Sequence, residues 1–487
     1  MSDIVAGRRI TLSLISHTNV GKTTLARTLL RRDIGEVADQ PHVTDVSEAH
    51  TLIETPDGLG MTLWDTPGFG DTAHLLKRLR ASRTPIGWLL SQVWDRFRDR
   101  PLWCSQQAVR NVQADADVVL YLVNATEDPA ASAYVGMELQ ILDWIGKPVV
   151  VLLNQLGPPH DPSRDREDME RWRSALSVGT SVRAILALDA FARCWVQEGA
   201  LLDTVTDVLP GDKQGDCRSL AAAWRRRNLD AFAGAMRILA SQIALAARDR
   251  EPIGEEPLGE KLRRVVVAGR GGDDASSRRR AMAALASRLD RAIVESTNRL
   301  IALHGLEGEA AQQVLERIRE NYTADTPVDA NLAAVLGGFV SGALGGLAAD
   351  LAAGGLTFGG GIVAGGVLGA FGAAGLAKGY NVVRGAGTAS LRWSPGFLHD
   401  LVKAALLRYL AVAHFGRGRG RWQDSEAPEF WKDVVEAAAE SRRGSLEQAL
   451  RRHDTEADEV LSAELTRLAR DVLVRLYPES ATVFEAN

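Results

Sequence analysis

The sequence has few cysteines, and those it has are far apart. Among the 487 residues there are three cysteines, Cys104, Cys194 and Cys217, and their spacing matches neither a disulfide framework nor a zinc-binding pattern. This scarcity excludes a disulfide framework and a zinc site, and it is typical of proteins kept in a reducing compartment. We therefore expect a cytoplasmic protein.

A large net charge and a hydrophobic leader are also missing. The formal net charge is −5, which is small for this length and argues against a chain wrapped in nucleic acid. No specific nucleic-acid partner is expected. The first apolar stretch, residues 10–15, is short for a signal peptide and leads directly into a Gly-Lys-Thr sequence. We interpret it as a β-strand.

The length of the chain exceeds what one hydrophobic core supports, so at least two domains are expected. Up to about residue 209, short β-rich runs alternate with helical stretches, which predicts an α/β fold with a mostly parallel sheet flanked by helices. Ala-, Leu- and Arg-rich stretches with helical spacing follow and predict an all-α region. The predicted domains are 1–209 and 210–487. The expected strands are 10–16, 49–54, 61–65, 117–124, 148–153 and 182–188.

The strongest motif is the segment 16–23, Ser-His-Thr-Asn-Val-Gly-Lys-Thr. It follows a β-like run and opens an amphipathic helix, which is the context of a phosphate-binding loop (P-loop). Backbone N–H groups at the helix N-terminus favour phosphate, Lys22 reaches the β and γ phosphates, and the Thr23 hydroxyl binds Mg²⁺. Ser16 replaces the usual first glycine, a place that a small residue fills with modest strain. The predicted nucleotide-binding residues here are Asn19, Val20, Gly21, Lys22, Thr23 and Thr24.

A second motif, Asp65-Thr-Pro-Gly68, stands at the end of a predicted strand about forty residues later. An aspartate in this place holds Mg²⁺ through water, and the N–H of the following glycine senses the γ-phosphate. The alternative is an ordinary turn aspartate. We predict that Asp65 is a metal ligand and that Gly68 takes part in catalysis.

Thr44 lies in a polar stretch between the two motifs. Its hydroxyl and carbonyl would close on Mg²⁺ and the γ-phosphate, as the switch segment of a nucleotide-dependent enzyme does. Thr51 and Thr55 are rivals, but both fall on the next predicted strand. The predicted catalytic set is Lys22, Thr44 and Gly68, and the predicted Mg²⁺ ligands are Thr23, Thr44 and Asp65.

This order of motifs resembles the Era-like branch of bacterial P-loop GTPases. The resemblance implies binding of GTP and GDP with Mg²⁺, and hydrolysis of GTP by water to GDP and phosphate. Potassium-stimulated members of that branch carry an asparagine at the position of Asn19, where it helps to hold K⁺ beside the phosphates. A cation there would neutralise developing charge. Alternatively, Asn19 only braces the loop by hydrogen bonding.

The layout of the whole chain also resembles a family of proteobacterial proteins in which such a GTPase domain precedes a helical domain of unknown function. The phrases at 188–198 and 414–420 contribute to this resemblance. It implies no known activity for the second half of the chain.

Phe69 follows Asp-Thr-Pro-Gly where small G proteins keep a glutamine that orients water. A phenyl ring has no group that can orient water. We therefore expect slow turnover unless K⁺, a partner or self-association as a homodimer completes the site.

The guanine-specificity motif departs from its usual pattern. After the strand at 148–153, Asn-Lys-x-Asp is expected, but the chain reads Asn154-Gln-Leu-Gly157. We predict that Asn154 contacts the nucleotide. Asp189, directly after the last strand, is a candidate for the missing carboxylate, and helix capping is the alternative role for it.

Residues 330–377 form a glycine- and alanine-rich segment in which Asp350 is the single charged residue. At about 1.5 Å per residue, each half is long enough to cross the roughly 30 Å apolar core of a bilayer. Glycines four residues apart permit close helix packing, which predicts a helical hairpin. It either contacts a membrane, which would place the protein at the inner membrane, or is buried within a soluble helical domain. The spaced glycines are Gly338, Gly342, Gly346, Gly361, Gly365 and Gly369.

Three functions fit these observations. The first is a slow GTPase used as a molecular switch. The second is a membrane-remodelling or membrane-inserting GTPase of the dynamin-like kind, and the third is a nucleotide-gated scaffold without hydrolysis.

Overall fold

The computed structural model describes ten stretches of the chain, which divide between two compact units. The first unit comprises Met1–Asp230, Ala413–Gln423 and Leu473–Asn487, and the second comprises Ala231–Val412 and Asp424–Val472. The described residues are 8–31, 47–91, 100–156, 161–176, 181–190, 194–253, 273–306, 380–384, 389–414 and 429–485.

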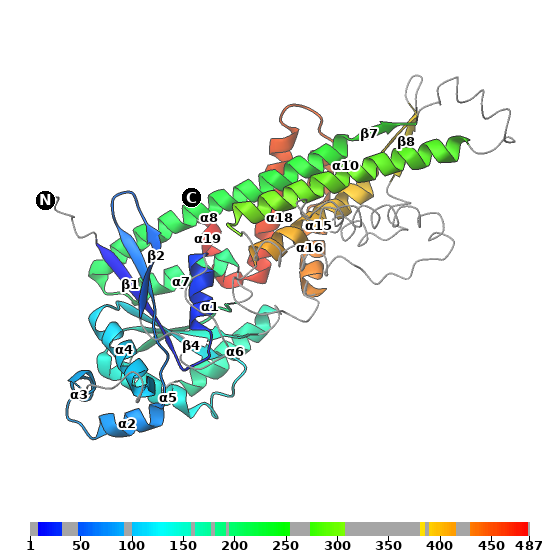
Figure 1. The fold of residues 1–487 in the computed structure, drawn as a ribbon. Helices are drawn as coiled ribbons and strands as arrows, with labels where there is room; N and C mark the ends of the chain where they lie inside the picture. The colour runs from blue at the N-terminus through cyan, green and yellow to red at the C-terminus, as the bar shows by residue number, and fades with distance from the viewer. Residues whose placement is uncertain are drawn as a thin grey trace, which may run out of the picture. The chain divides into compact units, whose positions relative to one another are not determined.

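A six-stranded sheet forms the centre of the first unit (Figure 1). Its strand order is β2-β3-β1-β4-β5-β6, and all neighbours are parallel except β2 and β3. The α/β prediction is confirmed, and each strand begins and ends within one residue of its expected bounds. The strands are β1 (Arg9–Ser16), β2 (Glu48–Glu54), β3 (Gly60–Asp65), β4 (Val118–Asn124), β5 (Val149–Asn154) and β6 (Val182–Ala187).

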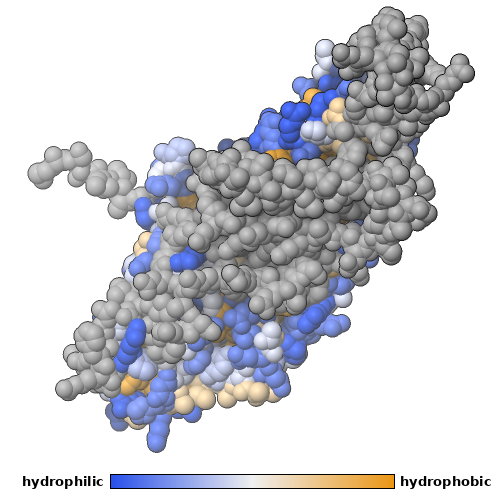
Figure 2. Space-filling view, turned by 45° about the vertical axis from the view of Figure 1, so that its right-hand side comes forward, coloured by the Kyte–Doolittle hydropathy of each residue, from blue (hydrophilic) through white to orange (hydrophobic). Residues whose placement is uncertain are grey.

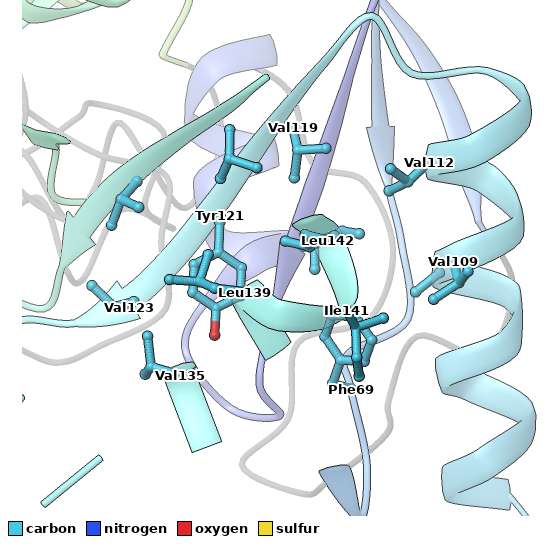
Figure 3. Packing of buried hydrophobic residues seen from close by; sticks show 14 of the residues in the cluster. Phe69, Val109, Val112, Val119, Tyr121, Val123, Val135, Leu139, Ile141 and Leu142 are labelled. Carbon is cyan, nitrogen blue, oxygen red and sulfur yellow. The ribbon is translucent and has the colours of Figure 1, made fainter. Parts of the chain in front are cut away.

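Helices flank this sheet, and a large apolar cluster fills the space between one face of the sheet and several of them. Val119, Tyr121 and Val123 of β4 pack in this cluster with residues of α2, α4 and α5 (Figure 3). Because β4 and β5 are buried along their length, their sequences are nearly uninterrupted apolar runs. The helices are α1 (Lys22–Leu30), α2 (Thr72–Arg80), α3 (Pro85–Ser91), α4 (Arg100–Ala114), α5 (Ala133–Ile145), α6 (Pro162–Ala175) and α7 (Trp195–Val208).

The last residues of the chain belong to the first unit. A short 3-10 helix η1 (Pro478–Ser480) and helix α19 (Thr482–Glu485) pack on α7. The rings of Trp195 and Phe484 meet edge to face, with centroids 5.6 Å apart. A Cβ atom at Gly199 would lie 2.6 Å from Val483 Cγ2, so the contact requires glycine at that position. The α7 helix is therefore covered by residues almost 300 positions further along the chain.

The second unit is mainly helical, as predicted. It also contains a small antiparallel sheet of order β7-β9-β8, which the sequence pattern did not predict. Three to five residues are too few for a recognisable alternation of apolar and polar positions. Its elements are α8 (Gly211–Arg248), which begins in the first unit, β7 (Arg250–Pro252), α10 (Asp273–Leu303), β8 (Tyr380–Arg384), β9 (Ala389–Trp393), α15 (Pro395–Ala413), α16 (Glu429–Ser441), α17 (Arg443–Leu450) and α18 (Ala457–Leu476).

The glycine-rich segment 330–377 lies outside the described residues, and so does its predicted hairpin. Within the described ranges, one helix, α8, is long and apolar enough to cross a membrane, a test that core helices of soluble proteins also pass. Hydrophilic residues predominate among the coloured atoms visible in Figure 2. Of the large apolar side chains that the structure describes, Leu245 and Leu303 are exposed.

Candidate nucleotide-binding site

The loop between β1 and α1 has the backbone that a phosphate cradle needs. Asn19 and Gly21 have left-handed φ values of 65° and 95°. A Cβ atom at position 21 would lie 2.7 Å from the Asn154 side-chain nitrogen, so both the backbone and the available space require glycine. The loop passes directly into helix α1 at Lys22, which places the helix N-terminus at the loop.

Lys22 is buried, and its position is set by Ser16. The Lys22 Nζ donates a hydrogen bond to Ser16 Oγ at 3.0 Å. Burial lowers the pKa of Lys22, and the negative charge of Asp65 opposes this shift. The serine that replaces the first glycine of the loop thus provides an acceptor for the Lys22 ammonium group. This role of Ser16 was not predicted from the sequence, where the residue is a departure from the motif.

Asp65, at the end of β3, lies beside the start of α1. Thr23 Oγ1 donates a hydrogen bond to Asp65 Oδ2 at 2.7 Å. Asp65 Oδ1 is buried and has no hydrogen-bond partner among the described residues. Desolvation raises the pKa of this carboxyl to about 6. A hydroxyl beside a carboxylate with an unsatisfied oxygen fits Mg²⁺, which binds few protein oxygens and keeps several waters.

Gly68 follows this strand and lies against the phosphate loop. A Cβ atom at position 68 would lie 2.9 Å from Lys22 Nζ and 3.3 Å from the Thr18 backbone. The Phe69 N–H donates to Ser16 O at 2.9 Å. The Phe69 side chain is fully buried in the apolar cluster (Figure 3). Thr44, the predicted switch residue, lies outside the described residues.

Asn154, at the end of β5, connects two loops of the site. Its Nδ2 donates to Val20 O at 2.7 Å, and its Oδ1 accepts from Ala190 N at 2.8 Å. The side chain is fully buried. Asn154 therefore fixes the phosphate loop to the loop that follows β6. Thr24, the third residue of α1, is buried as well.

Asp189 lies next to the altered specificity motif. Its Oδ2 accepts a hydrogen bond from Leu156 N at 2.7 Å, and the residue is almost fully buried. The residue at the N-cap of the next helix, α7, is Cys194. Gly157, where the motif would have its own aspartate, lies outside the described residues. The structure thus brings the Asp189 carboxylate to the motif that lacks one.

A buried acid lies behind the phosphate loop and was not predicted from the sequence. Glu138 of α5 is fully buried, and its Oε1 lies 2.7 Å from His17 Nδ1. A single acidic residue on the buried face of an otherwise apolar helix was the available signal.

Comparison with known proteins agrees with this geometry. Residues 11–155 match the model of a family described as 50S ribosome-binding GTPase. GTPase Era of Heliobacterium modesticaldum is 24% identical over 145 residues, which are 30% of this chain and 39% of that protein. The chain thus spans well under half the length of this curated relative. The fold, the arrangement of the loop residues and these matches identify residues 11–155 as a P-loop GTPase domain similar to that of Era.

The rest of the chain identifies the protein family. Residues 175–476, more than half of the chain, match the family described as "Domain of unknown function (DUF3482)". The protein belongs to this family, and its GTPase domain precedes the region that gives the family its description.

Two solved structures of Era are similar to parts of the chain. One is Era in complex with MgGDPNP and nucleotides 1506–1542 of 16S ribosomal RNA, with 17% identity over 42% of this chain and 58% of that chain, and a TM-score of 0.31. The other is a variant of Aquifex aeolicus Era bound to GDP and AlF4⁻, with 13% identity over 58% of this chain and 88% of that chain, and a TM-score of 0.31.

Proposed function

We propose that this protein binds GTP with Mg²⁺ and hydrolyses it slowly, and that it uses the GTP and GDP states as a molecular switch. The observation that carries the proposal is the convergence of Lys22, Thr23 and Asp65 at the N-terminus of α1. Lys22 would bind the β and γ phosphates, and Thr23 and Asp65 would hold Mg²⁺. The phosphoryl group passes to water without a covalent intermediate.

The choice of base is tested by nucleotide binding. We expect purified protein to bind labelled GDP more tightly than labelled ADP. Lys22→Ala should abolish this binding, and Lys77→Ala, which removes an exposed lysine of α2, should not change it. Tighter ADP binding, or binding that does not depend on Lys22, contradicts the proposal.

Slow turnover follows from the position of Phe69. Its ring is buried in the apolar cluster, so residue 69 supplies no group that orients water. We propose that K⁺ near Asn19, or self-association as a homodimer, completes the site. Asn19 is exposed, which leaves its side chain accessible to a cation.

Phosphate release at matched ionic strength in KCl and in NaCl tests this proposal. Stimulation by K⁺ that disappears in Asn19→Ala supports catalysis through the cation. Binding of GTP with no phosphate release in either salt favours the nucleotide-gated scaffold instead.

We also propose that residues 330–377 contact a membrane in one nucleotide state, which would place a cytoplasmic protein at the inner membrane. The length of the segment, in which Asp350 is the single charged residue, supports this. The protein should float with liposomes that contain anionic lipid in one of the two nucleotide states, with GTP or with GDP. This flotation should be lost when the segment is deleted. Liposome deformation by the full chain with GTP would favour the dynamin-like alternative, and absence of flotation in every nucleotide state would contradict membrane contact.

A further inference from the structure

A buried carboxylate connects the phosphate loop to helix α2. Glu138 Oε1 accepts a hydrogen bond from Thr72 Oγ1 at 2.8 Å and lies 2.7 Å from His17 Nδ1. Its Oε2 accepts from Tyr121 OH at 2.7 Å. The four side chains come from the phosphate loop, α2, β4 and α5, and Glu138 is fully shielded from solvent.

The energetics of burial make this arrangement stiff. An ionised carboxylate is costly in an apolar environment unless hydrogen bonds satisfy its oxygens. Here Thr72 and His17 share one oxygen, and Tyr121 binds the other. Burial raises the pKa of Tyr121 well above its ordinary value, so the phenol remains a donor. Movement of either Thr72 or His17 away from Glu138 leaves a buried charge with fewer partners.

The His17 end of this link is held from a second side. Its ring packs on the ring of Tyr134, with centroids 4.4 Å apart. The Tyr134 hydroxyl in turn donates to Glu127 Oε2 at 2.7 Å. Tyr134 and Glu138, both on α5, therefore hold the His17 ring from two sides. A displacement of the loop is then transmitted to Glu138, because the ring cannot rotate away.

The two ends of the link lie at the two places that contact phosphate. His17 is the first residue of the phosphate loop after β1. Thr72 begins α2, four residues after Gly68, which packs against Lys22. A γ-phosphate held by Lys22 and the Gly68 N–H therefore acts on both ends of the link.

We infer that Glu138 is a positioning residue that makes the start of α2 follow the phosphate loop, and that it thereby sets the preference of the site for the triphosphate over the diphosphate. The inference rests on the proposed GTP binding. Glu138 itself does not reach the nucleotide; it acts through His17 and Thr72.

Glu138→Gln tests the inference with little change in shape. The amide keeps one acceptor oxygen, and its NH₂ group meets groups that themselves donate. We expect the ratio of the affinities for a labelled non-hydrolysable GTP analogue and for labelled GDP to fall by roughly tenfold, as the loss of a charge-assisted hydrogen bond implies. The affinity for GDP should change little.

Two further variants separate positioning from general destabilisation. Thr72→Val removes one donor and keeps the shape of the side chain, so it should lower the same ratio, and the double variant with Glu138→Gln should lower it no further. The matched control is Asp143→Asn on the same helix. Asp143 Oδ1 accepts from Ser181 N at 3.0 Å, which is a contact outside the phosphate loop. The Asp143→Asn variant should therefore keep the wild-type ratio of affinities for the GTP analogue and for GDP.

Hydrogen exchange of the nucleotide-free protein provides a readout that does not depend on GTP binding. Glu138→Gln should accelerate amide exchange both in residues 16–21 and in residues 69–76, and Asp143→Asn should do so in neither segment. Faster exchange in one segment alone, or an equal loss of affinity for both nucleotides, overturns the inference. Linked exchange in a protein that binds neither nucleotide contradicts the proposed function but retains the link.

Discussion

Thr23 and Asp65 form a hydrogen-bonded pair that occupies one carboxylate oxygen and leaves the other buried. The distance from Thr23 Oγ1 to Asp65 Oδ2 is 2.7 Å, and Oδ1 has no hydrogen-bond partner among the described residues. The charge on Asp65 is therefore poorly compensated in the protein alone. A divalent cation would compensate it, and this gives Asp65 a measurable effect on stability.

Asp65 should make the nucleotide-free protein more stable as the pH falls towards 4. The pKa of Asp65 is about 6 in the folded protein and has its ordinary value of 3.8 in the unfolded chain. Between these values the folded state binds more protons, so the free energy of unfolding decreases as the pH rises. The difference corresponds to about 3 kcal/mol by pH 7.

Urea unfolding of the wild type and of Asp65→Asn measures this effect. We expect the variant to gain about 2.4 kcal/mol relative to the wild type between pH 4 and pH 7. Mg²⁺ with GDP should stabilise the wild type at pH 7 and have much less effect on the variant. A stability difference that does not vary with pH would show that the carboxyl titrates normally.

Gly68→Ala should impair the response to the γ-phosphate. The added methyl group would come 2.9 Å from Lys22 Nζ and 3.3 Å from the Thr18 backbone, so residue 68 or the Lys22 side chain would have to shift. We expect affinity for a GTP analogue to fall at least about tenfold with little change for GDP. Gly136→Ala on α5, where nothing lies within 4 Å of the added atom, is the control. If Gly68→Ala lowers the affinities for the GTP analogue and for GDP equally, Gly68 does not sense the γ-phosphate.

Asn154→Ala should destabilise the protein and weaken binding of every nucleotide. The substitution leaves Val20 O and Ala190 N without their buried partner, which costs about 1–3 kcal/mol for each group. The control is Asn124→Ala at the end of the neighbouring strand. Asn124 Oδ1 accepts from the exposed Thr126 N–H, so its loss should cost under about 1.5 kcal/mol. Similar unfolding free energies for the two variants would refute this role of Asn154.

Asp189 should account for part of the preference for guanine. If its carboxylate accepts hydrogen bonds from the base, the wild type will bind GDP more tightly than IDP, which lacks the 2-amino group. Asp189→Ala should then bind the two equally. If Asp189 only accepts the hydrogen bond from Leu156 N, the substitution will lower the affinities for GDP and IDP by the same factor, so the ratio of the two affinities will not change.

Much of the first unit could be predicted because its signals are local. The strands are strongly apolar, and the carboxyl ends of adjacent parallel strands meet at one edge of a sheet, which brings Thr23 and Asp65 together. The Ser16 bond to Lys22 could not be predicted because it depends on a side-chain rotamer in the loop. The link through Glu138 depends on contacts between residues more than sixty positions apart, which no local pattern encodes.

The sequence pattern of the second half was less informative. Helical spacing identified its long helices but not strand β7, whose three residues pair with β9 some 140 positions later. The packing of Phe484 on Trp195 was not predicted either, because helical spacing shows which residues are apolar but not which helix they cover.

The cover that α19 places on α7 also has a consequence for biosynthesis. Trp195 leaves the ribosome almost 300 residues before Phe484. At roughly 5–20 residues per second, the growing chain carries α7 without its final cover for roughly 15–60 s. A chain that stops before Phe484 lacks this contact with Trp195. This part of the first unit can therefore close only after synthesis has passed Phe484.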